Sequence, residues 1–228
     1  MVEISSSENQ QELRFTPEET AKLRDVVKLY EAVKAAMLFG EEISPANVTL
    51  PQVLKELRDA FDHFVRVIAA KTHISAVNGE EYMEKNLDKV FGHVYRCAYD
   101  VLDWLSIILR SRIQIELTKH SPSAIAASLP AYYTTIRPRL ENTIPQEIAR
   151  IRGMKDIGAP EQKSILEYAS YVAEIKQYWE TIVGVKPSLM DYSRKETRAK
   201  IRERIIFALI GAAITGLAIG LTKFFLGI

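Results

Sequence analysis

Residues 80–118 read EEYMEKNLDKVFGHVYRCAYDVLDWLSIILRSRIQIELT. The stretch contains no proline and no internal turn signal. Its apolar residues recur every three or four positions, which is the spacing of one helix face. A helix of this length would be about 60 Å long at a rise of 1.5 Å per residue. We therefore expect one helix over 80–118, longer than most helices of globular domains.

Two further helices are predicted before this stretch. The Thr-Pro-Glu-Glu sequence at 16–19 combines an N-cap residue, a first-turn proline and a capping-box glutamate, so a helix should begin there and end near Gly40. A second amphipathic helix is expected from about 52 to 72. The turn-forming AVNGEE segment at 76–81 would then make this second helix antiparallel to the third.

Prolines dominate the chain after the long helix. Those at 122, 130, 138 and 145 should divide residues 121–158 into short helices and turns. A further helix is expected over 159–183, with Pro187 as its end and a last helix beginning near Ser188. No strand pattern of useful length is present. The sequence predicts an all-α fold, an antiparallel bundle of four to five main helices, one of them very long, plus a C-terminal transmembrane helix.

The predicted transmembrane helix is the terminal run IIFALIGAAITGLAIGLTKFFLGI at 205–228, which holds one charge, Lys223. Bilayer hydrocarbon is about 30 Å thick, so a helix needs roughly 20 apolar residues to cross it. In lipid the backbone must satisfy its own hydrogen bonds, which leaves a helix as the state of a single span. The expected segments are a disordered N-terminus at 1–15, a cytoplasmic bundle at 16–187, a basic juxtamembrane helix at 188–204 and the span.

Charge is distributed unevenly along the chain. From Arg194 onward there are seven basic and two acidic residues, which leaves 23 basic and 27 acidic residues before it. A mildly acidic body is no general nucleic-acid binder. The basic residues just before the apolar run predict a body in the cytoplasm and a C-terminus beyond the inner membrane. They are Arg194, Lys195, Arg198, Lys200, Arg202 and Arg204. They would either bind anionic lipid headgroups or serve as the ordinary flank of a span.

Two smaller features bear on assembly and compartment. Ala208, Ala212, Gly216 and Gly220 recur at four-residue intervals, and such small-residue stripes let helices approach closely in lipid. Homo-oligomers are therefore expected. Cys97 is the single cysteine, so no internal disulfide can form, in keeping with a reducing compartment. The polar N-terminus lacks a secretory signal pattern.

One constellation in the second helix carries a candidate chemistry. Residues 58–63 read Arg-Asp-Ala-Phe-Asp-His. This R-x4-H spacing, with a polar residue after the arginine, resembles that of HEPN ribonucleases, which are small all-α bundles. The resemblance implies metal-independent RNA cleavage by Arg58 and His63, with Asp59 beside the arginine. In that chemistry an arginine stabilises charge on a phosphate and a histidine exchanges protons.

The match departs from one common variant, in which an aromatic residue lies two places after the histidine, because Val65 occupies that place. A structural interpretation stays open beside it. Arg58 with Asp62, and Asp59 with His63, have the i,i+4 spacing of helix side-chain pairs. Arg58 and His63 also lie about 140° apart around an ideal helix.

A second polar cluster lies on the long helix. His93, Arg96 and Asp100 share one face at i, i+3 and i+7. Counting back equal distances from the predicted turn places His63 opposite His93. We therefore expect these side chains to converge with Arg58 and Asp62 on one polar site, supporting the catalytic pair. The alternative is a buried polar network that fixes the register of the bundle.

No cofactor or metal site is expected. The sequence has no HExxH, no Glu-x-x-His, no CxxC and no phosphate-binding glycine loop. Two classes of function remain. The first is a membrane-anchored interaction or effector module that binds lipid and a protein partner, as in stress response or anti-phage defence. The second is a membrane-tethered ribonuclease whose partner is RNA, so the sequence leaves open whether the chain is an enzyme.

Overall fold

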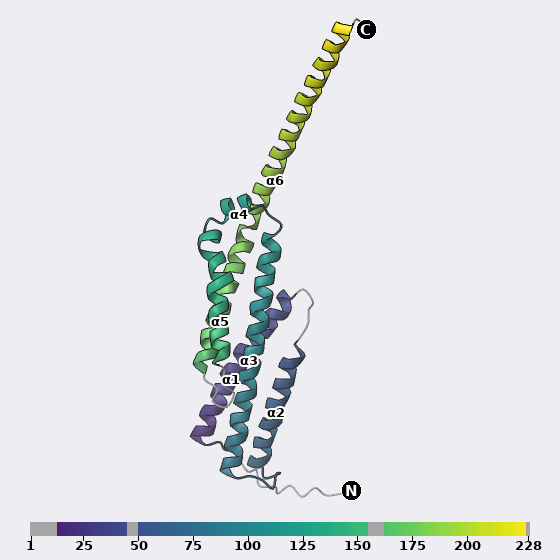
Figure 1. Cartoon of the computed structure of the whole chain (residues 1–228). Helices are drawn as coiled ribbons and strands as arrows, with labels where there is room; N and C mark the ends of the chain where they lie inside the picture. Colours follow the sequence, from purple (N-terminus) through teal and green to yellow (C-terminus); the bar gives the residue numbers. More distant parts are fainter. Residues whose placement is uncertain (1–12, 45–49, 155–161, 227–228) are drawn as a thin grey trace, which may run out of the picture. The chain divides into compact units, whose positions relative to one another are not determined.

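The computed structural model describes residues 13–44, 50–154 and 162–226, and every regular element in these ranges is helical (Figure 1). Side chains at 162, 220 and 222–226 lie outside the description. The elements are α1 (Pro17–Ile43), α2 (Pro51–Lys71), α3 (Glu80–Leu117), α4 (Pro122–Ser128), η1 (Tyr132–Ile136), η2 (Arg139–Thr143), α5 (Ile144–Gly153) and α6 (Gln162–Leu226). The all-α prediction is confirmed. Most of the N-terminus predicted to be disordered, at 1–15, lies outside the described residues.

The chain divides into two compact units. Unit 1 comprises Met1–Ser111 and Asn142–Lys176, and unit 2 comprises Arg112–Glu141 and Gln177–Ile228. The helices α3 and α6 each contribute residues to both units. The residues with the candidate chemistry, from Arg58 to Asp100, all belong to unit 1.

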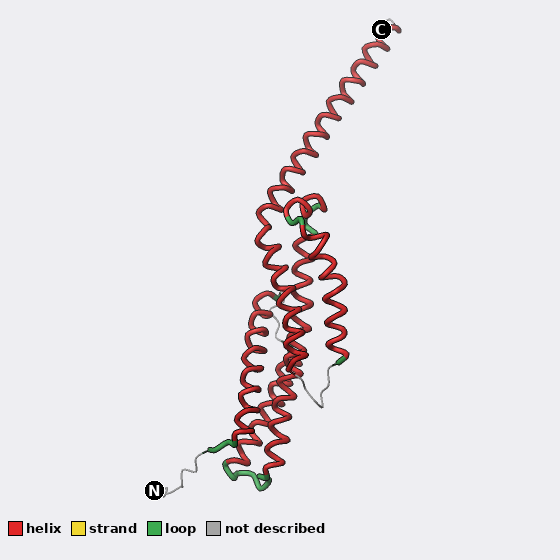
Figure 2. The backbone as a smooth tube through the Cα atoms, turned by 90° about the vertical axis from the view of Figure 1, so that its left-hand side faces the viewer, coloured by secondary structure: helices red, strands yellow, loops and turns green. Residues whose placement is uncertain are grey.

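Local sequence signals set the helices of unit 1 as expected. The Thr16 side chain accepts a hydrogen bond from the Glu19 backbone at 3.2 Å, and the Glu19 carboxylate accepts one from the Thr16 backbone at 2.8 Å. This capping box starts α1 where it was predicted. The long α3 runs unbroken to Leu117, also as predicted. All these elements appear as coiled segments in Figure 2.

Three tyrosines form the centre of unit 1. Tyr95, Tyr99 and Tyr168 are each about 1% exposed, and their rings contact one another in sequence at 5.2 and 5.9 Å between centroids. Buried hydroxyls require partners. The Tyr95 and Tyr99 hydroxyls hydrogen-bond to Ser164 Oγ at 3.1 and 3.0 Å, and the Tyr168 hydroxyl donates to Asp103. This satisfied core ties α6 to α3.

The helix break expected at Pro187 is absent. α6 is one helix of 65 residues that contains Pro187 in its interior. An interior proline removes the hydrogen bond to the carbonyl four residues earlier. Here Pro187 and Val183 are both exposed, so the position faces water rather than the core, and water can replace the lost partner. The described part of the helix predicted at 159–183 and the helix predicted from 188 therefore belong to one element, which begins at Gln162.

Among the residues that the structure describes, no helix is both long enough and apolar enough to cross a membrane. This finding overturns the prediction of a transmembrane helix at 205–228 and the fold class that included it. Residues 205–226 form the C-terminal part of α6.

Candidate functional site

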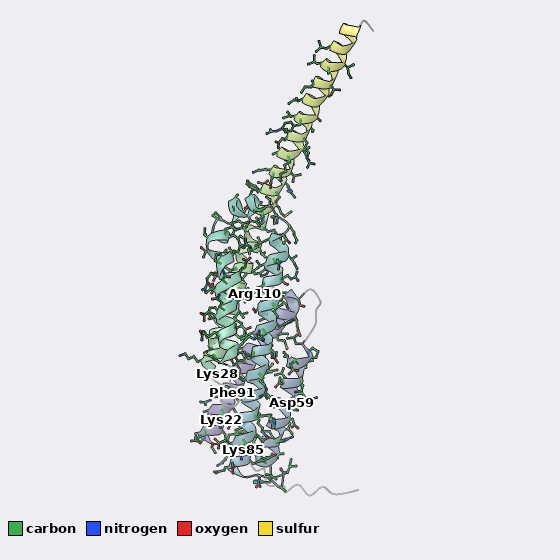
Figure 3. All side chains as sticks on the ribbon, in the orientation of Figure 1. Lys22, Lys28, Asp59, Lys85, Phe91 and Arg110 are labelled. Atoms are coloured by element: carbon green, nitrogen blue, oxygen red, sulfur yellow. The ribbon has the colours of Figure 1, made fainter. Side chains whose placement is uncertain are left out.

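A cavity of about 440 Å³ lies between α2 and α3 in unit 1. Its lining residues are Arg58, Asp59, Asp62, His63 and His93. The first four come from two adjacent turns of α2, and His93 comes from α3. Figure 3 labels Asp59 on α2 and shows the surrounding side chains as sticks. The predicted convergence of His63 with His93 is therefore present, and their rings stack at 5.4 Å between centroids with an interplanar angle of 22°.

A buried carboxylate lies behind His93. Glu56 is 5% exposed, and its Oε2 atom is 2.8 Å from both His93 Nδ1 and Arg96 Nε. Burial acts to raise the pKa of Glu56, but the hydrogen bonds and charges of Arg96 and His93 outweigh it and leave the pKa below its ordinary value. Glu56 is therefore a carboxylate at neutral pH. It holds His93 and Arg96 in fixed orientations.

His63 is held by an amide. Its Nδ1 atom is 2.8 Å from Asn86 Oδ1. The other end of the Asn86 side chain donates to the Tyr82 carbonyl at 2.8 Å, one turn earlier in α3. Asn86 is 4% exposed. Each of the two cavity histidines thus has one ring nitrogen fixed by a buried side chain.

The charged residues at the cavity pair locally. Arg58 donates to Asp59 Oδ1 from Nη2 at 2.7 Å and from Nε at 3.1 Å. Lys55 also donates to Asp59 at 3.2 Å. These hydrogen bonds, that of Arg58 first, lower the pKa of Asp59 to about 2. Asp62 accepts from Arg66 at 2.6 Å, so the i,i+4 partner of Asp62 is Arg66 rather than Arg58.

The sequence predicted most residues of the cavity but not the buried side chains that hold its two histidines. Arg96 and Asp100 were expected in the site, but neither is among its described lining residues. Arg96 lies behind the lining and contacts Glu56 and the lining residue His93. Glu56 and Asn86 were not identified. A signal existed, because Glu56 lies on the buried stripe of Val53 and Ala60, where an ionisable residue requires a partner.

Metal binding has no support at this cavity. Within the described ranges, no group of three or more His, Cys, Asp or Glu side chains could hold a metal ion.

The opposite flank of α2 is apolar. A second cavity of about 440 Å³ lies between α1, α2 and α3, with Phe61 65% exposed at its rim. Its lining residues are Leu23, Val26, Val27, Tyr30, Leu57, Ala60, Phe61, Phe64, Val90 and Val94. The polar cavity is therefore distinct from this apolar groove, although α2 and α3 contribute residues to both.

The C-terminal part of α6 is a second candidate site. Every described residue from Thr197 to Ile219 is exposed. The large apolar side chains of the run are between 48% and 68% exposed, Ile206 and Leu217 being the extremes. The basic residues predicted for lipid headgroups precede this run on the same helix. Of the small-residue stripe, Ala208, Ala212 and Gly216 are exposed, whereas the exposure of Gly220 lies outside the description.

Comparison with known proteins adds no relative: no family model matches the chain, and neither a curated protein nor a solved structure matches it.

Proposed function

We propose that this chain is a helical-bundle protein that binds an anionic lipid surface through the C-terminal part of α6 and acts there as a self-associating interaction module. The observation that carries the proposal is the exposed apolar run Ile205–Ile219 directly after six basic residues. Contiguous exposed apolar surfaces of this kind mark sites of protein or membrane interaction. Basic residues beside such a helix add attraction to anionic headgroups.

The proposal places the body on the cytoplasmic side of the inner membrane, where anionic lipids face the basic segment. An effector that acts on the membrane in stress response or anti-phage defence is one form of it. A protein partner would then bind the bundle, and the apolar groove between α1 and α2 offers a surface for it.

Flotation with lipid vesicles tests this function on the full chain. Wild-type protein should float with phosphatidylserine-containing vesicles. Leu209→Asp together with Leu217→Asp should abolish flotation, because a charge within an apolar helix opposes burial in lipid. Leu166→Asp places the same change at another exposed leucine, 69% exposed in unit 1, and should leave flotation unchanged. Flotation of the double variant equal to wild type would contradict the proposal.

Self-association is proposed to use the small-residue face of α6. A Cβ atom added at Gly216 would meet no atom within 4 Å, so this face is open to a second helix. Small residues permit close helix approach in lipid. Gly216→Leu should reduce oligomers in detergent, as measured by analytical ultracentrifugation, and unchanged assembly would rule this face out.

Metal-independent RNA cleavage is a second candidate function. The observation that favours it is that Arg58, Asp59 and His63, the residues of the HEPN-like motif, line one cavity. Arg58→Ala or His63→Ala should abolish cleavage of an oligoribonucleotide while the circular dichroism spectrum stays that of a helical protein. Cleavage that survives both changes would exclude this assignment.

A further inference from the structure

We infer that the Nε2 atoms of His63 and His93 are the two proton-transfer atoms of the α2–α3 cavity, and that Asn86 and Glu56 are their positioning residues. The inference rests on the ribonuclease function proposed above. It adds a second catalytic histidine, from a different helix than the motif that pointed to cleavage.

The hydrogen bonds of Asn86 fix the tautomer of His63. The Asn86 amide group donates to the Tyr82 carbonyl, which leaves Oδ1 as an acceptor toward His63 Nδ1, 2.8 Å away. Nδ1 must therefore carry a hydrogen. In the neutral ring the lone pair is then on Nε2.

Glu56 fixes His93 in the same way. The His93 Nδ1 atom is 2.8 Å from Glu56 Oε2 and 2.7 Å from Arg96 Nη2, and it cannot both donate to the first and accept from the second. Glu56 is ionised and buried, so a charge-assisted bond from Nδ1–H to its oxygen is the stronger of the two. Arg96 keeps its own bond from Nε to the same carboxylate. In the neutral ring of His93 the lone pair is then on Nε2.

The arrangement provides two proton-transfer atoms, one from each helix. The nearly parallel rings have centroids 5.4 Å apart, a spacing at which their Nε2 atoms can serve two different oxygens of one substrate. A carboxylate that orients a histidine through Nδ1 is a recurring device for acid–base chemistry. The charged groups that line the cavity with them are Arg58, Asp59 and Asp62, and Arg96 lies behind His93.

The reaction balances without a cofactor. His63 Nε2 takes the proton of the 2′-hydroxyl as the bond from O2′ to phosphorus forms. The bond from phosphorus to O5′ breaks, and the leaving oxygen takes a proton from Nε2 of His93, which enters the cycle protonated beside Glu56. The products are a 2′,3′-cyclic phosphate and a 5′-hydroxyl, and solvent returns both rings to their starting protonation states.

The test compares an ordinary oligoribonucleotide with one whose scissile 5′-oxygen is replaced by sulfur, because a thiolate leaves without needing a proton. On the ordinary substrate, His63→Gln and His93→Gln should each lower kcat by about 10²-fold or more, the usual contribution of a general acid or base. On the sulfur substrate, His93→Gln should recover to near the wild-type rate, whereas His63→Gln should not. Glu56→Gln should lower kcat and shift the pH profile. His73→Asn, at an exposed histidine outside the cavity, should change neither kcat nor the pH profile.

Nitrogen-15 NMR of the imidazoles gives a readout that is independent of turnover. Both cavity histidines should show a protonated Nδ1 and, when neutral, an unprotonated Nε2, and an unprotonated Nδ1 in either ring would overturn the inference. If His93→Gln cleaves RNA as fast as wild type, the catalytic role of His93 is contradicted, while the proposed ribonuclease function is not. Absence of cleavage by wild type would remove the ribonuclease function and the inference with it.

Discussion

Glu56 is the residue on which the polar site depends. It is buried, and its carboxylate is hydrogen-bonded to His93 and paired with Arg96, both from the neighbouring helix. Removing one partner of a buried charge network leaves the other groups uncompensated, which is far more costly than losing an exposed ion pair. A sequence pattern cannot show this, because the compensation comes from residues 37 and 40 positions away.

The first prediction concerns acid stability. The pKa of Glu56 lies below its ordinary value of 4.5, so the carboxylate stabilises the fold above about pH 4.5 and this contribution is lost as pH falls through the folded-state pKa. Glu56→Gln should lower the free energy of unfolding at neutral pH and weaken its decrease in acid. Urea unfolding as a function of pH measures both. Glu81→Gln, at a carboxylate whose side chain is 80% exposed, should leave the acid profile as in wild type.

The second prediction concerns Cys97. Its thiol is buried, and burial together with nearby Asp100 and Glu56 raises its pKa to about 12. Since the thiolate is the reactive form, iodoacetamide should modify Cys97 very slowly in the native protein and rapidly in urea. Mass spectrometry of the intact chain over time measures this. Fast modification of folded protein would show that α3 is not packed as described.

At the scale of elements, packing decides whether an alanine can replace a glycine within a helix. A Cβ atom at Gly40 of α1 would overlap the Trp104 ring of α3, whereas one at Gly184 of α6 would meet nothing within 4 Å. Gly40→Ala should therefore destabilise the protein by about 1–3 kcal/mol. Gly184→Ala should stabilise it by about 0.5–1 kcal/mol, since alanine is the better helix former. Thermal unfolding of the pair provides the comparison, and equal effects would contradict the close approach of α1 to α3.

Elements were predictable from sequence where the signal is local. The capping box at Thr16 and the absence of proline from 80 to 118 set α1 and α3 correctly. The prediction that a helix ends at Pro187 was wrong. The effect of this proline depends on whether water can reach the carbonyl that it leaves without a hydrogen bond, and only the fold shows this. The prediction for the terminal run was wrong because it rested on composition, whereas no helix among the described residues is both long enough and apolar enough to cross a membrane.

The candidate site was predictable in outline for a related reason. Equal counting from the turn before α3 placed His63 opposite His93, as the structure has it. The partners Glu56 and Asn86 could not be derived, because hydrogen bonding between helices depends on their rotation about their own axes. The same rotation explains why Asp100 is not among the described lining residues. Asp62 instead pairs within its own helix, with Arg66.

At the scale of the whole molecule, lipid binding is proposed for the C-terminal part of α6, and recognition or cleavage is proposed for unit 1. The two proposals rest on different residues, so the two activities should separate genetically. Variants at Leu209 and Leu217 should lose lipid binding and keep the chemistry of the cavity. Variants at Arg58 and His63 should lose cleavage and keep lipid binding. Flotation and cleavage assays on the same preparations measure the two activities.

Contact of the α6 run with lipid hydrocarbon is the central claim, and tryptophan quenching measures it most directly. A tryptophan in place of Leu217, 68% exposed, should be quenched by phosphatidylserine vesicles that contain brominated acyl chains. A tryptophan in place of Leu166 should add an unquenched signal and so serve as the matched control. The account predicts quenching at 217 alone, and an emission at 217 that brominated lipid leaves unchanged would contradict it.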